Sequence, residues 1–440
     1  MIVGAAYLAA TFAVLFAGVP IAFALGTVAL IFLALFVPIA TMGTVAHNVY
    51  QELANITLLT IPLFILKGAA IGRSRAGSDL YNAIYVWLNR VPGGLGIANV
   101  FACAIFAAMA GSSPATCSAI GSAGIPEMRR RGYSAELSAG IIAAGGTLGI
   151  LLPPSVTMIL YAVAAEQSLG RLFLAGIVPG AILSAFFAVY AVWRVRRERS
   201  QAAGRNESHA ILNEERFSMS ERFAAIPRVL PFLVLLTLVM VALYGGFATP
   251  SETAGLGAVV ALLLIAVVYG TWRLADLRPI LMGALSESTM LLMIVGMSML
   301  YAMVMSYLHI SQGAAEWIVA MKLPPSLLLG CVLGLVVVLG FFLPPASIIL
   351  MTAPVVLPPL RAAGFDLIWF GVIMTIVMEM GLIHPPVGLN IFVINSIAPD
   401  ITLKQIMWGT LPFVGIMAAT VLLLCVFPGL ITGLPNLIMK

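Results

Sequence analysis

The chain has 440 residues, of which 62% are hydrophobic and 9% are charged, with a formal net charge of +5. Soluble domains carry about 25% charged residues. The composition therefore excludes a mainly soluble protein and predicts an all-α integral membrane protein. We see no pattern that indicates nucleic-acid binding, because the excess positive charge comes from arginines at the edges of apolar segments.

The first half, residues 1–193, is predicted to begin with apolar spans. The segment from Met1 to Val19 lacks a basic start and continues into another apolar run, which favours a first span over a cleaved signal. Residues 94–126 are apolar except near Ser112, and basic residues at both ends place both ends in the cytoplasm. We therefore expect a re-entrant hairpin whose tip runs from Ser112 to Pro114, set against protein or a water-filled cavity.

A second interruption follows in residues 135–166, where Pro153 and Pro154 should break an apolar helix. Next comes the most polar stretch, residues 194–228, which is rich in arginine and predicted to be a cytoplasmic linker. Its later part, from Glu214 to Arg228, is expected to form an amphipathic surface helix.

The second half, residues 229–440, repeats this pattern from the opposite side of the membrane. Spans are predicted near 229–245, 253–272 and 289–308, with a last span near 404–428. Between them, residues 324–359 form a hairpin whose tip runs from Leu343 to Ser347, and residues 366–397 form a helix broken at Pro385 and Pro386. Both termini then lie outside, and the two halves are inverted repeats, which is typical of transporters with a site at the membrane midplane.

The chemistry is expected at these interruptions. Proline removes an N–H donor, so carbonyls near each break lose their helical partners. Freed carbonyls and helix C-termini suit a hard cation, whereas helix N-termini suit an anion. Glu379 is predicted inside a span, where it either takes part in transport or pairs with a neighbouring helix. His384 is either a proton-binding or substrate-binding group or a neutral histidine that is hydrogen-bonded to the backbone. Lys67 and Glu287 are expected near span ends, where they snorkel or orient the helices and do not contact the substrate.

Other activities find no support in the residue pattern. The four cysteines are scattered and are expected to be small buried hydrophobes without a redox role. Nucleotide-binding loops, HExxH and GxSxG are absent from the sequence, so we expect no enzyme. Energy for transport must come from an ion gradient or a partner.

With these motifs in view, the chain resembles the large membrane subunit, the M or DctM type, of tripartite ATP-independent periplasmic (TRAP) transporters. The resemblance covers nearly the whole chain and is sharpest in four segments, Gly111–Gly121, Ile125–Tyr133, Gly149–Ser155 and Met378–Asn390. It implies an elevator-type Na⁺ symporter for small organic acids, related to the wider ion-transporter superfamily. It further implies a small four-helix Q subunit, a periplasmic substrate-binding protein and a place in the bacterial inner membrane.

On this basis we predict two cation sites and an anion between the two tips. The first Na⁺ site is predicted at Ser112, Ser113, Gly145, Thr147, Gly149 and Pro153, and the second at Gly340, Phe341, Gly381, His384 and Val387. The substrate is predicted to contact Ser113, Thr116, Ser155, Ser347 and Asn390.

Two residues depart from the family pattern, which more often has glycine at position 114 and threonine at 384. Pro114 and His384 stand there instead. If a backbone carbonyl at 384 is the ligand, histidine is tolerable. If a hydroxyl is needed, the second cation site is in doubt.

Other functions stay open from the sequence. A stand-alone ion-coupled dicarboxylate carrier or exchanger would need no binding protein, and a passive channel or membrane scaffold would not accumulate substrate. The identity of the organic acid, whether carboxylate, sugar acid or sulfonate, does not follow from the residues.

Overall fold

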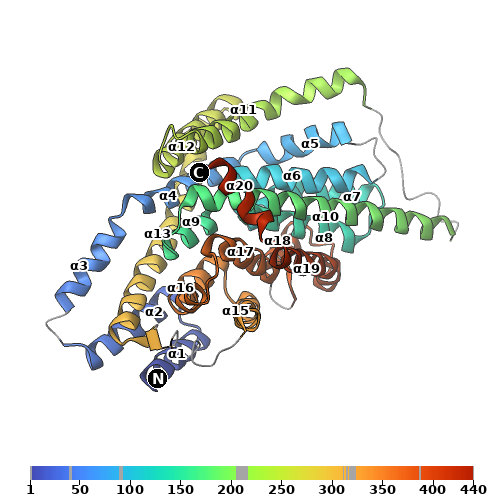
Figure 1. The fold of residues 1–440 in the computed structure, drawn as a ribbon. Helices are drawn as coiled ribbons and strands as arrows, with labels where there is room; N and C mark the ends of the chain where they lie inside the picture. Colours follow the sequence, from blue (N-terminus) through green and yellow to red (C-terminus); the bar gives the residue numbers. More distant parts are fainter. Residues whose placement is uncertain are drawn as a thin grey trace.

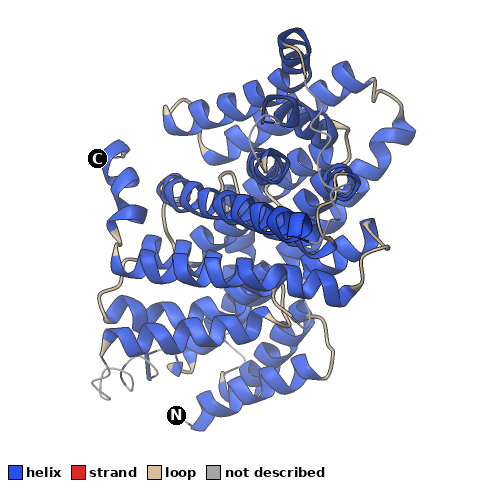
Figure 2. Cartoon of the chain, turned by 90° about the vertical axis from the view of Figure 1, so that its right-hand side faces the viewer, coloured by secondary structure: helices blue, strands red, loops and turns tan. Residues whose placement is uncertain are grey.

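The structure is a computed structural model that describes residues 2–38, 42–88, 93–204, 217–310, 312–313, 316, 324–385 and 388–439. Helices make up most of this described part, and none of its residues lies in a strand (Figure 2). By length and composition, five of the described helices are suited to cross a membrane, or up to eight if each sharply bent pair is one span. This agrees with the predicted all-α membrane protein.

One set of helices, which we call the outer group, contains most of the predicted spans that belong to neither a hairpin nor a broken helix (Figure 1). Within it α4 packs against α12 and α13, α2 packs against α13, and α11 packs against α5. Its members are α1 (Ile2–Phe16), α2 (Ile21–Phe36), α3 (Met42–Leu53), α4 (Thr60–Gly72), α5 (Ala76–Leu88), α11 (Met219–Tyr244), α12 (Pro250–Tyr269) and α13 (Leu274–Tyr307).

The other set, the hairpin group, contains the interrupted segments and the helices that pack on them. The first half supplies α6 (Gly94–Ala110), α7 (Ser113–Arg130), α8 (Ala135–Leu151), α9 (Val156–Ala164) and α10 (Leu169–Gly204). The second half supplies α15 (Pro325–Gly340), α16 (Pro345–Ala362), α17 (Leu367–Ile383), α18 (Leu389–Ile397), α19 (Leu403–Val426) and α20 (Gly429–Ile438).

Packing within the hairpin group follows the same scheme in both halves of the chain. Hairpin α6–α7 packs on α8, as hairpin α15–α16 packs on α17. The halves also exchange partners, because α7 contacts α18 while α16 contacts α9, and α19 contacts α8 while α10 contacts α17. The hairpin of each half therefore packs against the broken helix of the other half.

Local sequence explains where the broken helices begin. The Asp366 carboxylate accepts bonds from the N–H groups of Ile368 and Trp369, which caps the start of α17. Ser134 caps α8 in the same way and also donates its hydroxyl to Glu198 of α10 at 2.7 Å. Ser155 caps α9 by accepting from the N–H of Met158.

The helix breaks lie where the sequence predicted them, and several helix bounds differ. α13 begins at Leu274, well before the predicted start near residue 289, because the polar residues at 286–288 remain helical beside a pocket described below. α10 continues to Gly204, so the predicted linker starts as helix. α11 begins at Met219 after a capping box of Ser218 and Glu221 and bends by 52° near Pro227, while residues 205–216 lie outside the described part. The short helix α20 was not predicted.

Candidate functional site

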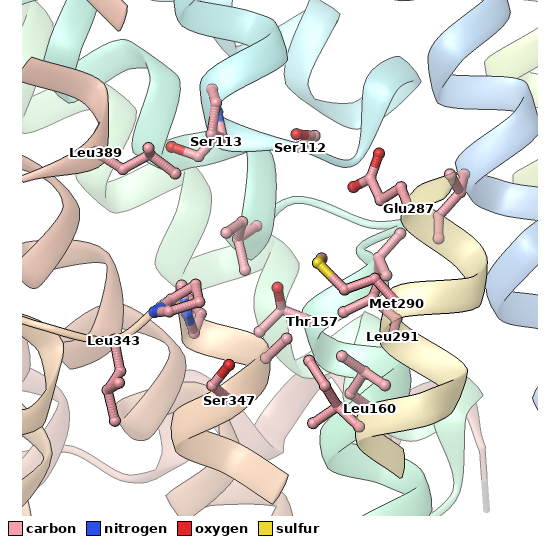
Figure 3. Close-up of a pocket in the computed structure, with 18 of the residues that line it drawn as sticks. Ser112, Ser113, Thr157, Leu160, Glu287, Met290, Leu291, Leu343, Ser347 and Leu389 are labelled. Carbon is pink, nitrogen blue, oxygen red and sulfur yellow. The ribbon is translucent and has the colours of Figure 1, made fainter. Parts of the chain in front are cut away.

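A pocket of about 880 Å³ lies between the two hairpin tips and the outer group (Figure 3). Its hairpin side includes Ser112, Ser113, Leu343 and Ser347, together with Thr157 from α9. Its outer side comes from α1, α2, α4 and α13 and from the turn between α1 and α2. The two tips, which are far apart in the sequence, therefore border one cavity.

The first tip is shaped by a glycine that closely approaches the first broken helix. Gly111 has φ +66° and ends α6, and a Cβ there would lie 2.8 Å from the carbonyl oxygen of Pro154. From the other direction, a Cβ on Gly149 would lie 2.9 Å from the carbonyl oxygen of Ser112. Only residues without side chains fit these positions, so the tip and the break between α8 and α9 stay in direct backbone contact.

Two carbonyls at this break lack helical donors for a chemical reason. The N–H groups that would bond the carbonyls of Gly149 and Ile150 belong to residues 153 and 154, which are both proline. The helix accordingly ends with Leu152 in an extended conformation. Gly149 itself lies beside the backbone of Ser112, and the two freed oxygens could offer a hard cation neutral ligands.

The second half builds a corresponding cluster. The carbonyl of Gly381 loses its donor to Pro385, and α17 ends at His384 in an extended conformation. A Cβ on Gly381 would lie 2.4 Å from the carbonyl oxygen of Gly340, so α15 and α17 touch through their backbones. The rings of Phe341 and His384 stack with centroids 4.7 Å apart. The His384 Nδ1 also contacts the carbonyl oxygen of Pro385.

A buried polar cluster lies under the first tip and joins the two halves. The Asn390 amide of α18 donates to the Ser113 hydroxyl at 2.8 Å and to the Ala143 carbonyl at 3.3 Å. Glu379 of α17 is 1% exposed, and the Ser113 hydroxyl is a neighbouring polar side chain. Both Glu379 carboxylate oxygens and the Asn390 Oδ1 have no hydrogen-bond partner among the described residues. Three buried acceptors without protein donors favour a cation, a proton or a water molecule at this place.

The structure places most of the predicted site residues in or near the pocket. Some line the pocket, and others form contacts within the helices beside it. Ser112, Ser113 and Ser347 line the pocket, and Figure 3 shows the Ser347 hydroxyl directed into it. Thr116 donates to the Ser112 carbonyl and Thr147 to the Ala144 carbonyl, each within its local turn. Gly145 packs against Cys103, one turn before Gly149.

Three predicted substrate residues lie behind the pocket surface and are fully buried. Thr116 bonds within its own turn, Ser155 caps a helix and Asn390 lies beneath Ser113. Val387 lies outside the described residues, as does Pro386. Substrate and Na⁺ contacts at all of these positions stay predictions.

Three pocket residues were missed or misplaced by sequence reasoning. Glu287 was expected to orient a span end, but it lies within α13 and faces the pocket. Arg73, at the end of α4, and Thr157, in α9, also line the pocket. An ionisable residue in an otherwise apolar helix was the available signal for Glu287.

Comparison with known proteins agrees with this architecture. The family of the DctM component of tripartite ATP-independent periplasmic transporters matches residues 8–430. The chain belongs to this family. It is 35% identical over 398 residues, 90% of each chain, to the large permease protein DctM of a C4-dicarboxylate TRAP transporter from Pseudomonas aeruginosa. It is 28% identical, over 96% of each chain, to the large permease protein SiaM of a sialic acid TRAP transporter from Vibrio cholerae.

Among solved structures, this DctM-family chain is similar to the YdaH transporter of Alcanivorax borkumensis. The TM-score is 0.62 at 13% sequence identity, and the match covers 95% of this chain and 98% of the other. This likeness concerns the fold alone. The resemblance to large TRAP permease subunits that the motifs indicated is confirmed.

Proposed function

We propose that this permease subunit imports a small organic acid anion by Na⁺ symport. The observation that carries the proposal is the pairing of two equivalent clusters, one at Ser112 and Gly149 and one at Gly340 and Gly381, around a single pocket. Each cluster combines a hairpin tip or arm with a helix that ends at a double proline. Such clusters supply carbonyl oxygens for cations and helix ends for an anion.

Na⁺ suits these clusters because their ligands are neutral oxygens. Hard cations take carbonyl, hydroxyl and carboxylate oxygens, and the first cluster adds the Ser113 hydroxyl. The unpartnered oxygens of Glu379 lie next to that hydroxyl and favour a positive ion in the same region. We assign the predicted residues to two Na⁺ sites on this basis, with His384 contributing through its backbone because its ring is stacked on Phe341.

We further propose an elevator mechanism with inverted repeats. The hairpin group is internally continuous, since each half's interrupted segments pack on those of the other half. Its contact with the outer group includes pairs of small residues, Gly68 against Ala110 and Gly77 against Ala119. Small residues allow close contact between membrane helices without interlocking side chains. In this mechanism the hairpin group moves as one body past an outer group that stays in place.

The proposed assembly contains a small four-helix Q subunit and a periplasmic binding protein, as in the TRAP family, in the bacterial inner membrane. Both termini of this chain are assigned to the periplasmic side, because the arginine-rich stretch after residue 193 belongs in the cytoplasm.

The experiment that tests this function is uptake of radiolabelled organic acids into proteoliposomes that contain this chain with its Q subunit. We expect accumulation only with an inward Na⁺ gradient and only when the binding protein is added. Uptake that ignores the Na⁺ gradient would overturn the coupling. Na⁺-driven uptake without the binding protein would instead indicate a stand-alone carrier.

A further inference from the structure

The pocket carries two charged side chains of opposite sign, both on its outer wall. Arg73 and Glu287 line the cavity, and no other pocket residue is charged. No hydrogen bond or ion pair holds either side chain among the described residues, although their helices α4 and α13 pack together. A guanidinium and a carboxylate that share a cavity without pairing are both available to a ligand.

The spacing of the two groups follows from α13. The Arg73 guanidinium lies over Gly283, where an added Cβ would be 2.8 Å from its Nη2 atom. Gly283 is one helical turn before Glu287, so both charges face the same side of α13. Figure 3 shows the Glu287 carboxylate directed from α13 across the cavity toward Ser112.

The opposite wall of the pocket is neutral. Its polar side chains all carry hydroxyl groups, and the rest is apolar; they are Ser112, Ser113, Ser118, Thr157 and Ser347. Hydroxyls both donate and accept, so they place little demand on the sign of a ligand. Discrimination between ligands must therefore come from Arg73 and Glu287.

The Arg73 guanidinium and the Glu287 carboxylate bind different chemical groups of a ligand. A guanidinium has only donors and matches an acid group in a two-pronged geometry, while an ionised carboxylate only accepts. A second acid group facing Glu287 would meet a like charge and be repelled. An O–H or N–H group facing Glu287 would be bound instead.

Building on the proposed function, we propose that the substrate is an organic acid with a hydroxyl or ammonium donor on its carbon skeleton, held by Arg73 at the acid group and by Glu287 at the donor. Arg73 sets affinity for the anion, and Glu287 sets the preference for the donor. The cavity volume of about 880 Å³ lies near the upper end of typical ligand pockets, which leaves room for polyhydroxylated acids.

Three acids with one skeleton test this directly: succinate carries hydrogen at its second carbon, malate a hydroxyl and aspartate an ammonium. Dissociation constants are measured by thermal-shift titration of the purified complex with the Q subunit in saturating Na⁺. We expect malate or aspartate to bind at least about tenfold more tightly than succinate, as for sites built around a polar substrate group. Which of the two binds more tightly distinguishes the hydroxyl from the ammonium.

Variants separate the two roles. Glu287→Gln should bring the donor-bearing acid and succinate to within about threefold of one another, because the amide also donates. Arg73→Gln should weaken all three acids by about tenfold or more at an unchanged ratio, with Arg73→Lys intermediate. Asp276→Asn, on α13 but outside the pocket, is the matched control. It should change neither the affinity for the three acids nor the preference for the donor-bearing acid.

Succinate binding as tight as that of malate and aspartate, or an unchanged preference in Glu287→Gln, would overturn this inference. The comparison of the three acids in the wild-type protein decides the question even if a variant fails to fold. Acid binding that needs Na⁺ but ignores the donor would refute the role of Glu287 and leave the proposed symport standing. Absence of Na⁺-dependent binding of any acid would count against the proposed function itself.

Discussion

A close approach between the outer group and the first hairpin gives a sharp prediction about motion. A Cβ on Gly68 of α4 would lie 2.3 Å from the carbonyl oxygen of Ala110. Real Cβ atoms essentially never come within 3.0 Å of such a neighbour, so Gly68→Ala forces α4 and α6 apart. Overpacking of this kind costs about 1–3 kcal/mol.

The free-energy cost of Gly68→Ala should fall only on the position of the hairpin group seen in this structure. In the proposed mechanism the hairpin group slides past α4, and in that second position Gly68 and Ala110 are no longer in contact. About 1.4 kcal/mol changes an equilibrium tenfold. Gly68→Ala should therefore lower the population of the position seen in this structure, relative to the position after sliding, by about 5- to 150-fold. Transport should slow because the protein then seldom occupies one of the two positions that the transport cycle needs.

The assay is disulfide formation between Gly72→Cys and Ala115→Cys. The Cβ position of Gly72 lies 3.9 Å from the Cβ of Ala115, within the range of about 3.5–4.5 Å that disulfides need. The background protein has alanine in place of its native cysteines, Cys103, Cys117, Cys331 and Cys425. In membranes, the cross-link should form readily in this background and block uptake until it is reduced, and Gly68→Ala should slow its formation.

The matched control is Gly255→Ala on α12, where a Cβ would meet only Leu63 at an ordinary 3.8 Å. It should leave cross-linking unchanged. If Gly68→Ala lowers the melting temperature but does not slow cross-linking, the two groups form one rigid body and the sliding mechanism is refuted. Uptake that continues with the cross-link intact would refute it too.

Further variants probe the site and its support. Ser113→Ala removes the acceptor of the Asn390 amide and should raise the Na⁺ concentration for half-maximal uptake by about tenfold, whereas Ser122→Ala, whose exposed hydroxyl bonds only Ser118 within α7, should leave it unchanged. Glu379→Gln keeps the size of the side chain but removes its charge, so Na⁺-dependent thermal stabilisation should weaken while folding, followed by size-exclusion chromatography, is retained; unaltered stabilisation would separate Glu379 from the cation. Asp366→Ala deletes the cap of α17 and should lower the free energy of unfolding by about 1 kcal/mol, with Asp366→Asn restoring most of it; equal stability of all three proteins would contradict the capping assignment.

The parts of this fold that the sequence predicted are those with a local chemical cause. Pro153 and Pro385 lack N–H groups and must interrupt a helix wherever it lies, and the polar residues around Ser112 mark a turn in an apolar run. The positions of both hairpins and both broken helices followed from these signals. The family followed from the same motifs.

Other features depend on contacts between distant segments. The bond between Asn390 and Ser113 joins residues from different halves, and no local pattern indicates it. Glu287 looked like the end of a span because a charge in an apolar helix is costly, whereas the cavity beside α13 accommodates it. Arg73 has no local signal either, because a basic residue between two helices is typical of a membrane boundary.

The central claim is that two cation clusters flank one anion pocket, and the ratio of Na⁺ to substrate moved tests it most directly. Initial fluxes of labelled Na⁺ and labelled acid are measured in the same proteoliposomes, with the Q subunit and the binding protein present. We predict that at least about two Na⁺ ions enter with each anion, one for each of the clusters around Gly149 and Gly381. Substrate entry without accompanying Na⁺ would contradict the account.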